Sequence, residues 1–250
     1  MKIDLLKKTD FSIIHFDEIN STNLYALEHM TSIPDKTVIT ADIQKNGRGR
    51  LDRKWVSSSS DNIYFSVVLK PEGKIETLPL ANVTQYMCII LCRIFLKYGI
   101  NPSIKWPNDI LINGKKISGI LSETSFTGGV FNGIVIGAGI NINCTPAQNE
   151  ELNKPVTSLY SEIKSKIDKT NFLIDLLGLF FDTYTDFMTY GFKHIKTEYL
   201  NYFPFTNRTI TVNNQGSIIE GKVKDISDDG TLVLLKSNGT EINIIAGDIA

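Results

Sequence analysis

The sequence has few cysteines and histidines, which limits the cross-links and metal centres that it can form. Its 250 residues include three cysteines and three histidines, and the histidines lie far apart. A small, odd number of cysteines does not make a disulfide framework and is typical of a reducing compartment. Cys88 and Cys92 are four residues apart and share one face of a helix, where small buried thiols are the simplest interpretation. We therefore expect no metal held by the protein itself.

The chain also lacks an excess of charge of either sign. Lysine and arginine number 26 against 27 acidic residues, a net charge of −1. Because general nucleic-acid binders are usually basic, no DNA partner is expected. The N-terminal "MKIDLLKKTDF" has no apolar signal core, and no apolar run approaches membrane-spanning length. The sequence therefore predicts a cytoplasmic protein with no membrane partner.

Apolar periodicity predicts a mixed set of helices and strands. The composition, 42% hydrophobic, is ordinary for a globular protein with a core. A short helix is expected after Asn20 or Ser21, which are both good helix caps. Asn113-Gly114 predicts a tight type I′ hairpin. Strands are predicted over residues 12–19, 37–44 and 62–70, one helix over 80–98 and two helices within 170–202.

The last part of the chain differs from the rest in its sequence pattern. After Asn207, short alternating strands are separated by "NNQG", "SDDG" and "SNG", which predicts a small all-β barrel. We expect one domain over residues 1–204 and a second over 205–250. In the first, the strands cluster in hairpins and do not alternate strictly with helices, which favours an α+β fold.

One short stretch concentrates positive charge. "QKNGRGRLDRKW", residues 44–55, contains five basic side chains, with Asp52 as its acidic residue. Most charge runs are solvated surface turns. However, arginine offers forked donors that suit carboxylate and phosphate, and glycine allows the main chain to approach an anion. Trp55 adds a flat face for a ring system. The stretch is therefore either a solvated turn or a loop that folds over a phosphorylated ligand.

Standard nucleotide motifs are absent from the sequence. It contains no Walker A pattern, and "GAGINI" has Ile142 where the dinucleotide fingerprint needs a third glycine. "KWPND", residues 105–109, is a second candidate motif. It is either punctuation at a strand end or a site where Lys105 is held, partly buried, near an anionic centre.

Taken together, the motifs resemble those of biotin protein ligases. "STN", "GRGRLDRKW", "KWPNDI", "KKISGIL" and "GAGIN" occur in that family's order and spacing. The resemblance covers about residues 19–143, and the C-terminal β region lies where the family carries a small SH3-like barrel. It implies a catalytic domain related to class II aminoacyl-tRNA synthetases and lipoate ligases.

The resemblance also implies an activity. Such enzymes make biotinyl-5′-AMP from biotin and ATP with Mg²⁺, then transfer biotin to one lysine of a biotin carboxyl carrier protein, as of acetyl-CoA carboxylase. The implied partners are biotin, ATP and the carrier, with a homodimer possible. Some bacterial members carry an N-terminal DNA-binding winged helix. Because "STN" begins at residue 21, we expect none here and a monofunctional ligase.

Site residues are carried over motif by motif. Lys105, Arg48 and Arg50 match the family's catalytic cations, with Lys105 close to the reacting carboxylate. The matched biotin contacts are Ser21, Thr22, Asn23, Gln44, Arg48, Gly49, Arg50 and Lys105. The matched ATP and adenylate contacts are Arg50, Arg53, Trp55, Asn108, Lys116, Gly119 and Asn141.

These residue types suit the implied chemistry. A carboxylate and a triphosphate must meet, and fixed cations in a dried site cancel their repulsion. A glycine-rich flap that closes over the adenylate excludes water from it. Asp52 departs from the family, because many members have glycine there, and its charge leaves the role of Arg53 open.

Two rival functions remain at this point. The first is a lipoate ligase on the same fold, although the sequence has "GRGR" where that family usually shows an "RRxSGGG"-like segment. The second is a biotin-responsive DNA regulator without enzymatic activity, against which the near-neutral charge argues.

Overall fold

The computed structural model describes residues 11–51, 53–57, 59–73, 75–145, 155–214 and 216–250. The strands of its larger part are β1 (Ser12–Ile19), β2 (Thr37–Gln44), β3 (Ile63–Leu69), β4 (Ser103–Lys105), β5 (Asp109–Ile112), β6 (Lys115–Thr127) and β7 (Val130–Ile140). Its helices are α1 (Thr22–Glu28), α2 (Val83–Lys97), α4 (Leu159–Ile163), α5 (Lys169–Tyr190) and α6 (Phe192–Tyr202), with short 3₁₀ turns η1 (Ile75–Thr77) and η2 (Leu80–Asn82). These elements confirm the strands and helices predicted from periodicity.

Local sequence signals account for several boundaries. Ser21 caps α1, because its Oγ accepts a hydrogen bond of 3.4 Å from the Leu24 amide. Asn113 and Gly114 have φ of 50° and 76°, as a type I′ turn requires, and they join β5 to β6. Gly191 separates α5 from α6 at a φ of 66°.

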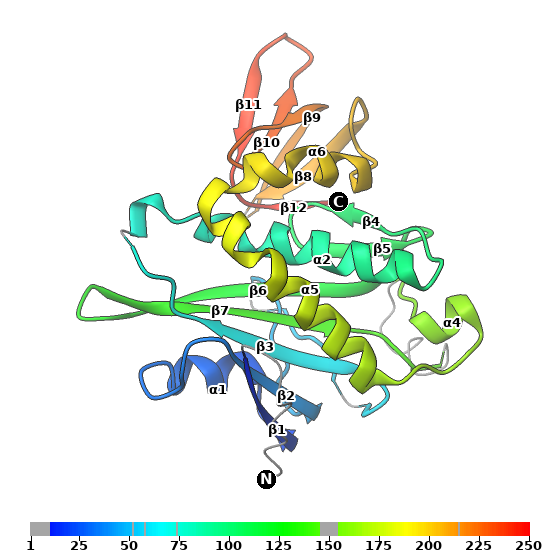
Figure 1. Cartoon of the computed structure of the whole chain (residues 1–250). Helices are drawn as coiled ribbons and strands as arrows, with labels where there is room; N and C mark the ends of the chain where they lie inside the picture. The colour runs from blue at the N-terminus through cyan, green and yellow to red at the C-terminus, as the bar shows by residue number, and fades with distance from the viewer. Residues whose placement is uncertain (1–10, 52, 58, 74, 146–154, 215) are drawn as a thin grey trace.

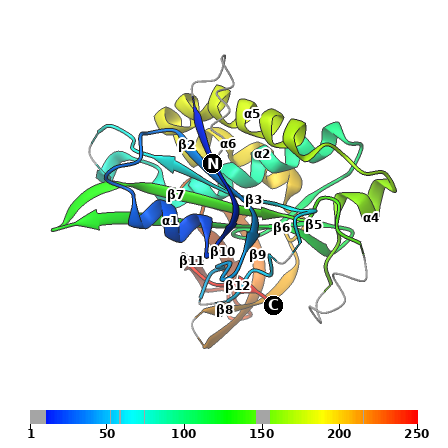
Figure 2. The ribbon, with the colours of Figure 1, turned by 90° about the horizontal axis from the view of Figure 1, so that it is seen from below.

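The central sheet is mixed and is covered on both faces. Its seven strands lie in the order β1-β2-β3-β7-β6-β5-β4, with β1 parallel to β2. Figure 1 shows α2 and α5 crossing the sheet, and Figure 2 shows α1 on the opposite side from them. Because side chains alternate along a strand, Ile39 packs toward α1 while its neighbour Val38 joins the core under the long helices.

Helix α2 corrects one prediction. The segment Leu80–Lys97 has a mean hydropathy of 1.3 and is long and apolar enough to cross a membrane by composition alone. The expectation that no apolar run approaches that length was wrong. However, 61% of the segment is buried inside the fold, where it forms the centre of the core, and a buried core helix passes the same test. Cys88 and Cys92 lie here as buried free thiols, and burial raises the pKa of both.

The C-terminal region is a five-stranded antiparallel sheet, in the order β11-β10-β9-β8-β12. Its strands are β8 (Thr209–Asn214), β9 (Ser217–Ile226), β10 (Leu232–Leu235), β11 (Glu241–Ile244) and β12 (Asp248–Ile249). It stands at one end of the larger part (Figure 1). Gln85 Nε2 and Trp106 Nε1 both donate to the Gly230 carbonyl, at 2.9 and 3.2 Å. The apolar core runs without a break from α2 to Ile226 and Leu232, so the two regions share one core.

Candidate active site

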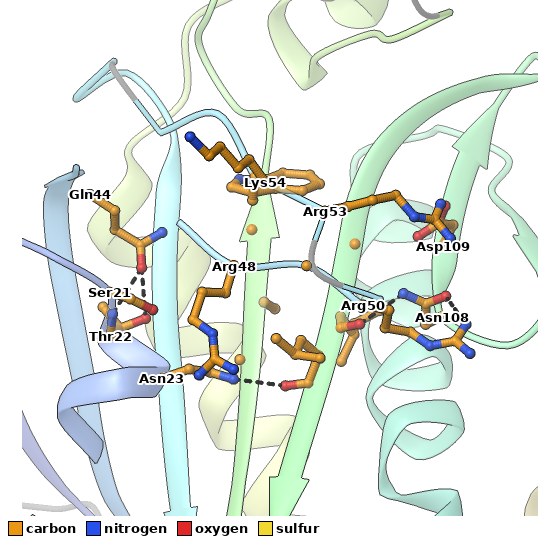
Figure 3. A pocket seen from close by; sticks show the side chains of 18 of the residues that line it. Ser21, Thr22, Asn23, Gln44, Arg48, Arg50, Arg53, Lys54, Asn108 and Asp109 are labelled. Atoms are coloured by element: carbon orange, nitrogen blue, oxygen red, sulfur yellow. Dashed lines mark hydrogen bonds between the residues drawn. The ribbon is translucent and has the colours of Figure 1, made fainter. Parts of the chain in front are cut away.

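A cavity opens on the α1 face of the sheet, beneath the basic stretch. Most of the residues carried over from the motifs meet here. Those lining it are Ser21, Thr22, Asn23, Gln44, Arg48, Gly49, Arg50, Arg53, Trp55, Asn108, Lys116 and Gly119. In Figure 3, Ser21, Thr22, Asn23 and Gln44 lie on one side, Arg50, Arg53, Asn108 and Asp109 on the other, and Arg48 between them. The cavity therefore has a neutral polar end and a strongly charged end.

The polar end is a hydrogen-bonded network built on α1. Gln44 Oε1 accepts from the Thr22 amide at 2.9 Å and from Thr22 Oγ1 at 3.2 Å. The Gln44 amide nitrogen donates to Ser57 Oγ at 2.9 Å. Ser66 Oγ lies 2.7 Å from Thr22 Oγ1 and 2.6 Å from Asn23 Oδ1. Each polar side chain is thus held in one orientation before any ligand binds, as precise recognition of a small polar ring requires.

The floor of the cavity consists of glycines on the central strands. A Cβ on Gly139 would lie 2.2 Å from the Trp55 ring, and one on Gly119 would lie 2.9 Å from it. A Cβ on Gly137 would lie 1.9 Å from Asn23 Oδ1. Gly119 of "KKISGIL" and Gly139 of "GAGIN" therefore leave room for the Trp55 indole, and Gly137 leaves room for the Asn23 amide. Trp55 Nε1 is buried here and has no hydrogen-bond acceptor among the described residues.

The basic stretch folds back on itself as a small hairpin over the cavity. The Gly49 amide donates to the Arg53 carbonyl at 2.7 Å, and the Trp55 amide donates to the Gly47 carbonyl at 2.9 Å. Gly47 is required by close packing, because its Cβ would lie 2.4 Å from the Trp55 carbonyl oxygen. The residues that turn from Arg48 to Trp55 thus form a flap that presents several cations to the cavity.

The three arginines of the flap pair with carboxylates from distant parts of the chain, and Lys116 on β6 pairs with a carboxylate on neighbouring β5. Arg48 Nη2 lies 2.8 Å from Glu123 Oε1, and Lys116 Nζ lies 2.6 Å from Asp109 Oδ1. Arg50 and Arg53 both bind the carboxylate of Asp248. Asp52, the acidic residue within the stretch itself, lies outside the described residues. Glu123, Asp109 and Asp248 therefore offset only part of the positive charge of the lining cations, and an anion that enters the ligand-free site competes with these carboxylates.

Arg50 is the most enclosed of the loop cations. Its Nη1 donates to Asn108 Oδ1 at 3.1 Å and to the Gly247 carbonyl at 3.2 Å. Burial lowers the pKa of Arg50, and the neighbouring charge of Arg53 lowers it further, while Asp109 raises it. Two adjacent guanidinium groups of like charge favour an anion between them.

Two predicted site residues do not line the cavity. Lys105, at the end of β4, is paired in register with Asp109, so it lies on the cavity face of the sheet but beyond the residues that line the cavity. Burial lowers its pKa, and the charge of Asp109 raises it. Asn141 is buried, with its Nδ2 donating 2.9 Å to the Thr157 carbonyl. Lys116, which the motifs placed among the adenylate contacts, lines the cavity, with its Nζ 5.3 Å from the centre of the Trp55 ring.

Sequence reasoning missed several residues of the site. Lys54, Asp109, Gly137, Gly139 and Asp248 line the cavity but were not assigned to it. The two glycines and Asp109 lie inside quoted motifs, so a motif-wide assignment would have included them. Asp248 carries no local signal, because it is 198 residues from Arg50 in the chain.

One group of possible metal ligands lies outside the cavity. His15, Asp17 and Asp42 approach one another on β1 and β2, with His15 Nε2 3.6 Å from Asp42 Oδ2. The group is exposed to partly exposed, as many acidic clusters are without any ion.

Comparison with known proteins decides the family. The Biotin/lipoate A/B protein ligase family matches residues 15–141, about half of the chain, and the Biotin protein ligase C terminal domain matches residues 205–250. The chain belongs to this ligase family. The resemblance inferred from the motifs is thereby confirmed.

Individual relatives agree with this assignment. The ligase is 33% identical to "Bifunctional ligase/repressor BirA" of Bacillus subtilis, over 95% of this chain and 73% of that protein. It is 30% identical to "Biotin--[acetyl-CoA-carboxylase] ligase" of Paracoccus denitrificans, over 89% of this chain and 94% of that one. The structure is similar to biotin protein ligase from Aquifex aeolicus in complex with biotin and ATP, at 28% identity and a TM-score of 0.79, over 95% and 97% of the two chains.

Proposed function

We propose that this ligase activates biotin with ATP to biotinyl-5′-AMP and then transfers biotin to a lysine of a biotin carboxyl carrier protein. The observation that carries the proposal is the cavity with two chemically different ends. Thr22 and Gln44, held in a neutral hydrogen-bonded network with buried Ser66, line one end, and Arg50 and Arg53 line the other. Biotinyl-5′-AMP has a polar ring at one end and a phosphate at the other, which matches the neutral and charged ends of the cavity.

The motif residues then have distinct roles. Ser21, Thr22 and Gln44 hold the biotin ring, and Arg50 and Arg53 receive the phosphates once Asp248 gives them up. Trp55 is the flat surface against which the adenine packs, above the glycine floor. The backbone of the flap around Gly49 covers the product and excludes water.

The first step needs no protein nucleophile. An oxygen of the biotin carboxylate attacks the α-phosphorus of ATP, the bond from that phosphorus to the bridging oxygen breaks, and pyrophosphate leaves. Charge develops on the leaving oxygens and at the attacked phosphorus. Cations fixed in place stabilise that charge without reorganising, and this is where Arg50, Arg53 and Lys116 contribute. In the second step a carrier lysine attacks the carboxyl carbon, AMP leaves and an amide forms.

We assign the lysine beside the reacting carboxylate to Lys116. Lys116 lines the cavity, and its Nζ lies 5.3 Å from the centre of the Trp55 ring, whereas Lys105 is opposite Asp109 in the sheet and does not line the cavity. Lys105 then contributes to catalysis indirectly, through its electrostatic interaction with Asp109. Asp109 is the carboxylate that forms the ion pair with Lys116.

Magnesium fits the site through the nucleotide. Both carboxylates that line the cavity, Asp109 and Asp248, are paired with cations in this structure. Mg²⁺ is commonly bound by substrate phosphates with one or two carboxylates and retained waters, and does not need a dedicated protein cage. Bound in that way, it would offset the charge of the triphosphate, and Asp109 and Asp248 are the lining carboxylates that would hold it.

A second cleft supplies an approach for the carrier. It measures about 420 Å³ and lies between η2, β6 and the C-terminal sheet. It shares Arg50 and Leu121 with the cavity, so a lysine entering along it arrives at the charged end. The C-terminal region, proposed as a domain over residues 205–250, forms one wall through Gly230 and Ile245. We place this activity in the cytoplasm, where a reducing environment suits the free buried thiols.

Pyrophosphate exchange tests the first step. The protein should catalyse biotin-dependent exchange between ATP and pyrophosphate without any carrier, since the adenylate forms before the acceptor binds. Incubation with biotin, ATP-Mg and a purified carrier domain should then raise the carrier's mass by one biotinyl group. Exchange that runs with lipoate in place of biotin, or only when the carrier is present, would overturn the proposal.

A further inference from the structure

Glu123 stands beside the cavity on β6, in a position that none of the sequence motifs marks. Side chains alternate along a strand, so Glu123 lies on the same face as Leu121 and Gly119, which line the cavity. Its side chain is 20% exposed, whereas most surface carboxylates are far more open. A carboxylate this enclosed needs specific partners.

The two carboxylate oxygens of Glu123 bind two different segments. Oε1 lies 2.8 Å from Arg48 Nη2, in the basic flap. Oε2 accepts a hydrogen bond of 3.0 Å from Asn23 Nδ2, in the first turn of α1. One side chain on the central sheet therefore ties the flap to the helix that carries the "STN" residues.

The Asn23 amide is fully engaged by the protein. Its oxygen lies 2.6 Å from Ser66 Oγ, and its nitrogen donates to the Leu121 carbonyl at 3.2 Å as well as to Glu123. The oxygen also lies where a Cβ on Gly137 would be, at 1.9 Å, so the amide cannot turn freely. Asn23 thus connects Glu123 to the Ser66, Thr22 and Gln44 network.

We propose that Glu123 is a positioning residue for the adenylation reaction. It holds Arg48 so that the flap lies in a fixed position relative to the polar end of the cavity. This rests on the proposed function for the nature of the ligand alone. Arg48 paired with Glu123 is neutralised and oriented, so it anchors the flap and leaves the phosphates to Arg50 and Arg53. A charge-assisted bond to a guanidinium is among the stronger side-chain contacts, and its loss releases the flap.

The substitution Glu123→Gln isolates this role. The glutamine carbonyl keeps the hydrogen bond from Asn23, while the ion pair with Arg48 is lost. We expect biotinyl-5′-AMP to leave the enzyme on the order of tenfold faster, with biotin affinity changed less than about threefold. Arg48→Gln should produce the same acceleration, and adding Glu123→Gln to it should produce no more.

The matched control is Glu198→Gln. Glu198 pairs with Arg93 at 2.6 Å, with similar side-chain exposure, 30% and 32%, and it lies outside the cavity lining. This variant should lose a comparable ion pair and leave adenylate release unchanged. Equal acceleration in both variants would mean that Glu123 acts through global stability, which overturns the inference.

A second readout does not depend on the ligand. Trypsin cuts after lysine and arginine, and the flap contains Arg48, Arg50, Arg53 and Lys54. In the ligand-free protein, Glu123→Gln should be cleaved in the flap several-fold faster than the native chain, and Glu198→Gln should not. Unchanged flap cleavage overturns the inference. Failure of the native enzyme to form the adenylate, with flap cleavage still accelerated, would overturn the proposed function and leave the positioning role standing.

Discussion

Asp248 Oδ1 accepts a hydrogen bond of 3.1 Å from Arg50 Nη1, which joins the last strand of the C-terminal sheet to the flap over the cavity. Asp248 also binds Arg53, so one carboxylate holds both guanidinium groups that the proposed mechanism assigns to phosphate. The side chains of Arg50 and Asp248 are 20% and 24% exposed, so the pair is well shielded from solvent. Under the proposed mechanism, Asp248 holds in the ligand-free protein the two cations that would otherwise bind an anionic substrate group.

Substitution of Asp248 by asparagine should destabilise the protein in a way that an anion repairs. Two neighbouring arginines lose their counter-charge, and we expect a loss of about 1–2 kcal/mol in the free energy of unfolding. Pyrophosphate should raise the melting temperature of Asp248→Asn more than that of the native chain, because it replaces the missing carboxylate. Glu241→Gln, which removes the partner of Lys224 on the same sheet, is the control and should show no such difference. An equal response to pyrophosphate in all three proteins would contradict the prediction.

The two lysines should separate kinetically. Lys116→Ala should lower the rate of pyrophosphate exchange on the order of 10²–10³-fold, by analogy with the loss of a single donor that stabilises developing charge. Lys105→Ala should have a smaller effect, since Lys105 does not line the cavity. Biotin affinity measured by calorimetry should change little in either variant. A larger loss of rate in Lys105→Ala would show that Lys105, as the motifs imply, is the lysine beside the carboxylate.

The glycine floor predicts a specific loss of nucleotide binding. Gly139→Ala places a Cβ 2.2 Å from the Trp55 ring, so the indole must move off the floor. We expect a stability cost of about 1–3 kcal/mol, as for other overpacked sites, with a red shift of tryptophan emission and weaker ATP binding. The control is Gly178→Ala in α5, where nothing lies within 4 Å of the added Cβ. That variant should be neutral or stabilised by about 0.5–1 kcal/mol with native ATP binding, since glycine weakens a helix. Native emission in Gly139→Ala would show that Trp55 does not rest there.

The shared core predicts a single unfolding transition. Buried residues of β9 and β10, such as Ile226 and Leu232, belong to the same apolar cluster as α2. Buried Gln85 also donates to the Gly230 carbonyl, and Gln85→Leu should cost about 1–3 kcal/mol by leaving polar groups unpaired. Denaturant unfolding followed by circular dichroism and by tryptophan emission should give coincident curves in both proteins. Two separate transitions would show that residues 205–250 fold as an independent domain.

The sequence by itself determined the elements and the family. Strand and helix patterns, the Ser21 cap and the Asn113-Gly114 turn depend on residues a few positions apart, and local backbone preferences are enough to fix them. The motifs identified the family for the same reason, because each motif is a short segment whose residues are close together in the sequence.

Only the tertiary structure decided how the charges of the site are paired and which residues line the cavity. Glu123 and Asp248 reach the flap because strand register and the docking of the C-terminal sheet bring them there, and no local pattern encodes that meeting. Lys105 and Lys116 are both strand lysines in the sequence, and the pairing of β4, β5 and β6 brings both of them near Asp109, with Lys116 in the lining of the cavity. The apolar segment Leu80–Lys97 is likewise assigned to the core by the sheet and helices that cover it. Contacts between residues far apart in the chain depend on the packing of the whole fold, which periodicity and spacing do not specify.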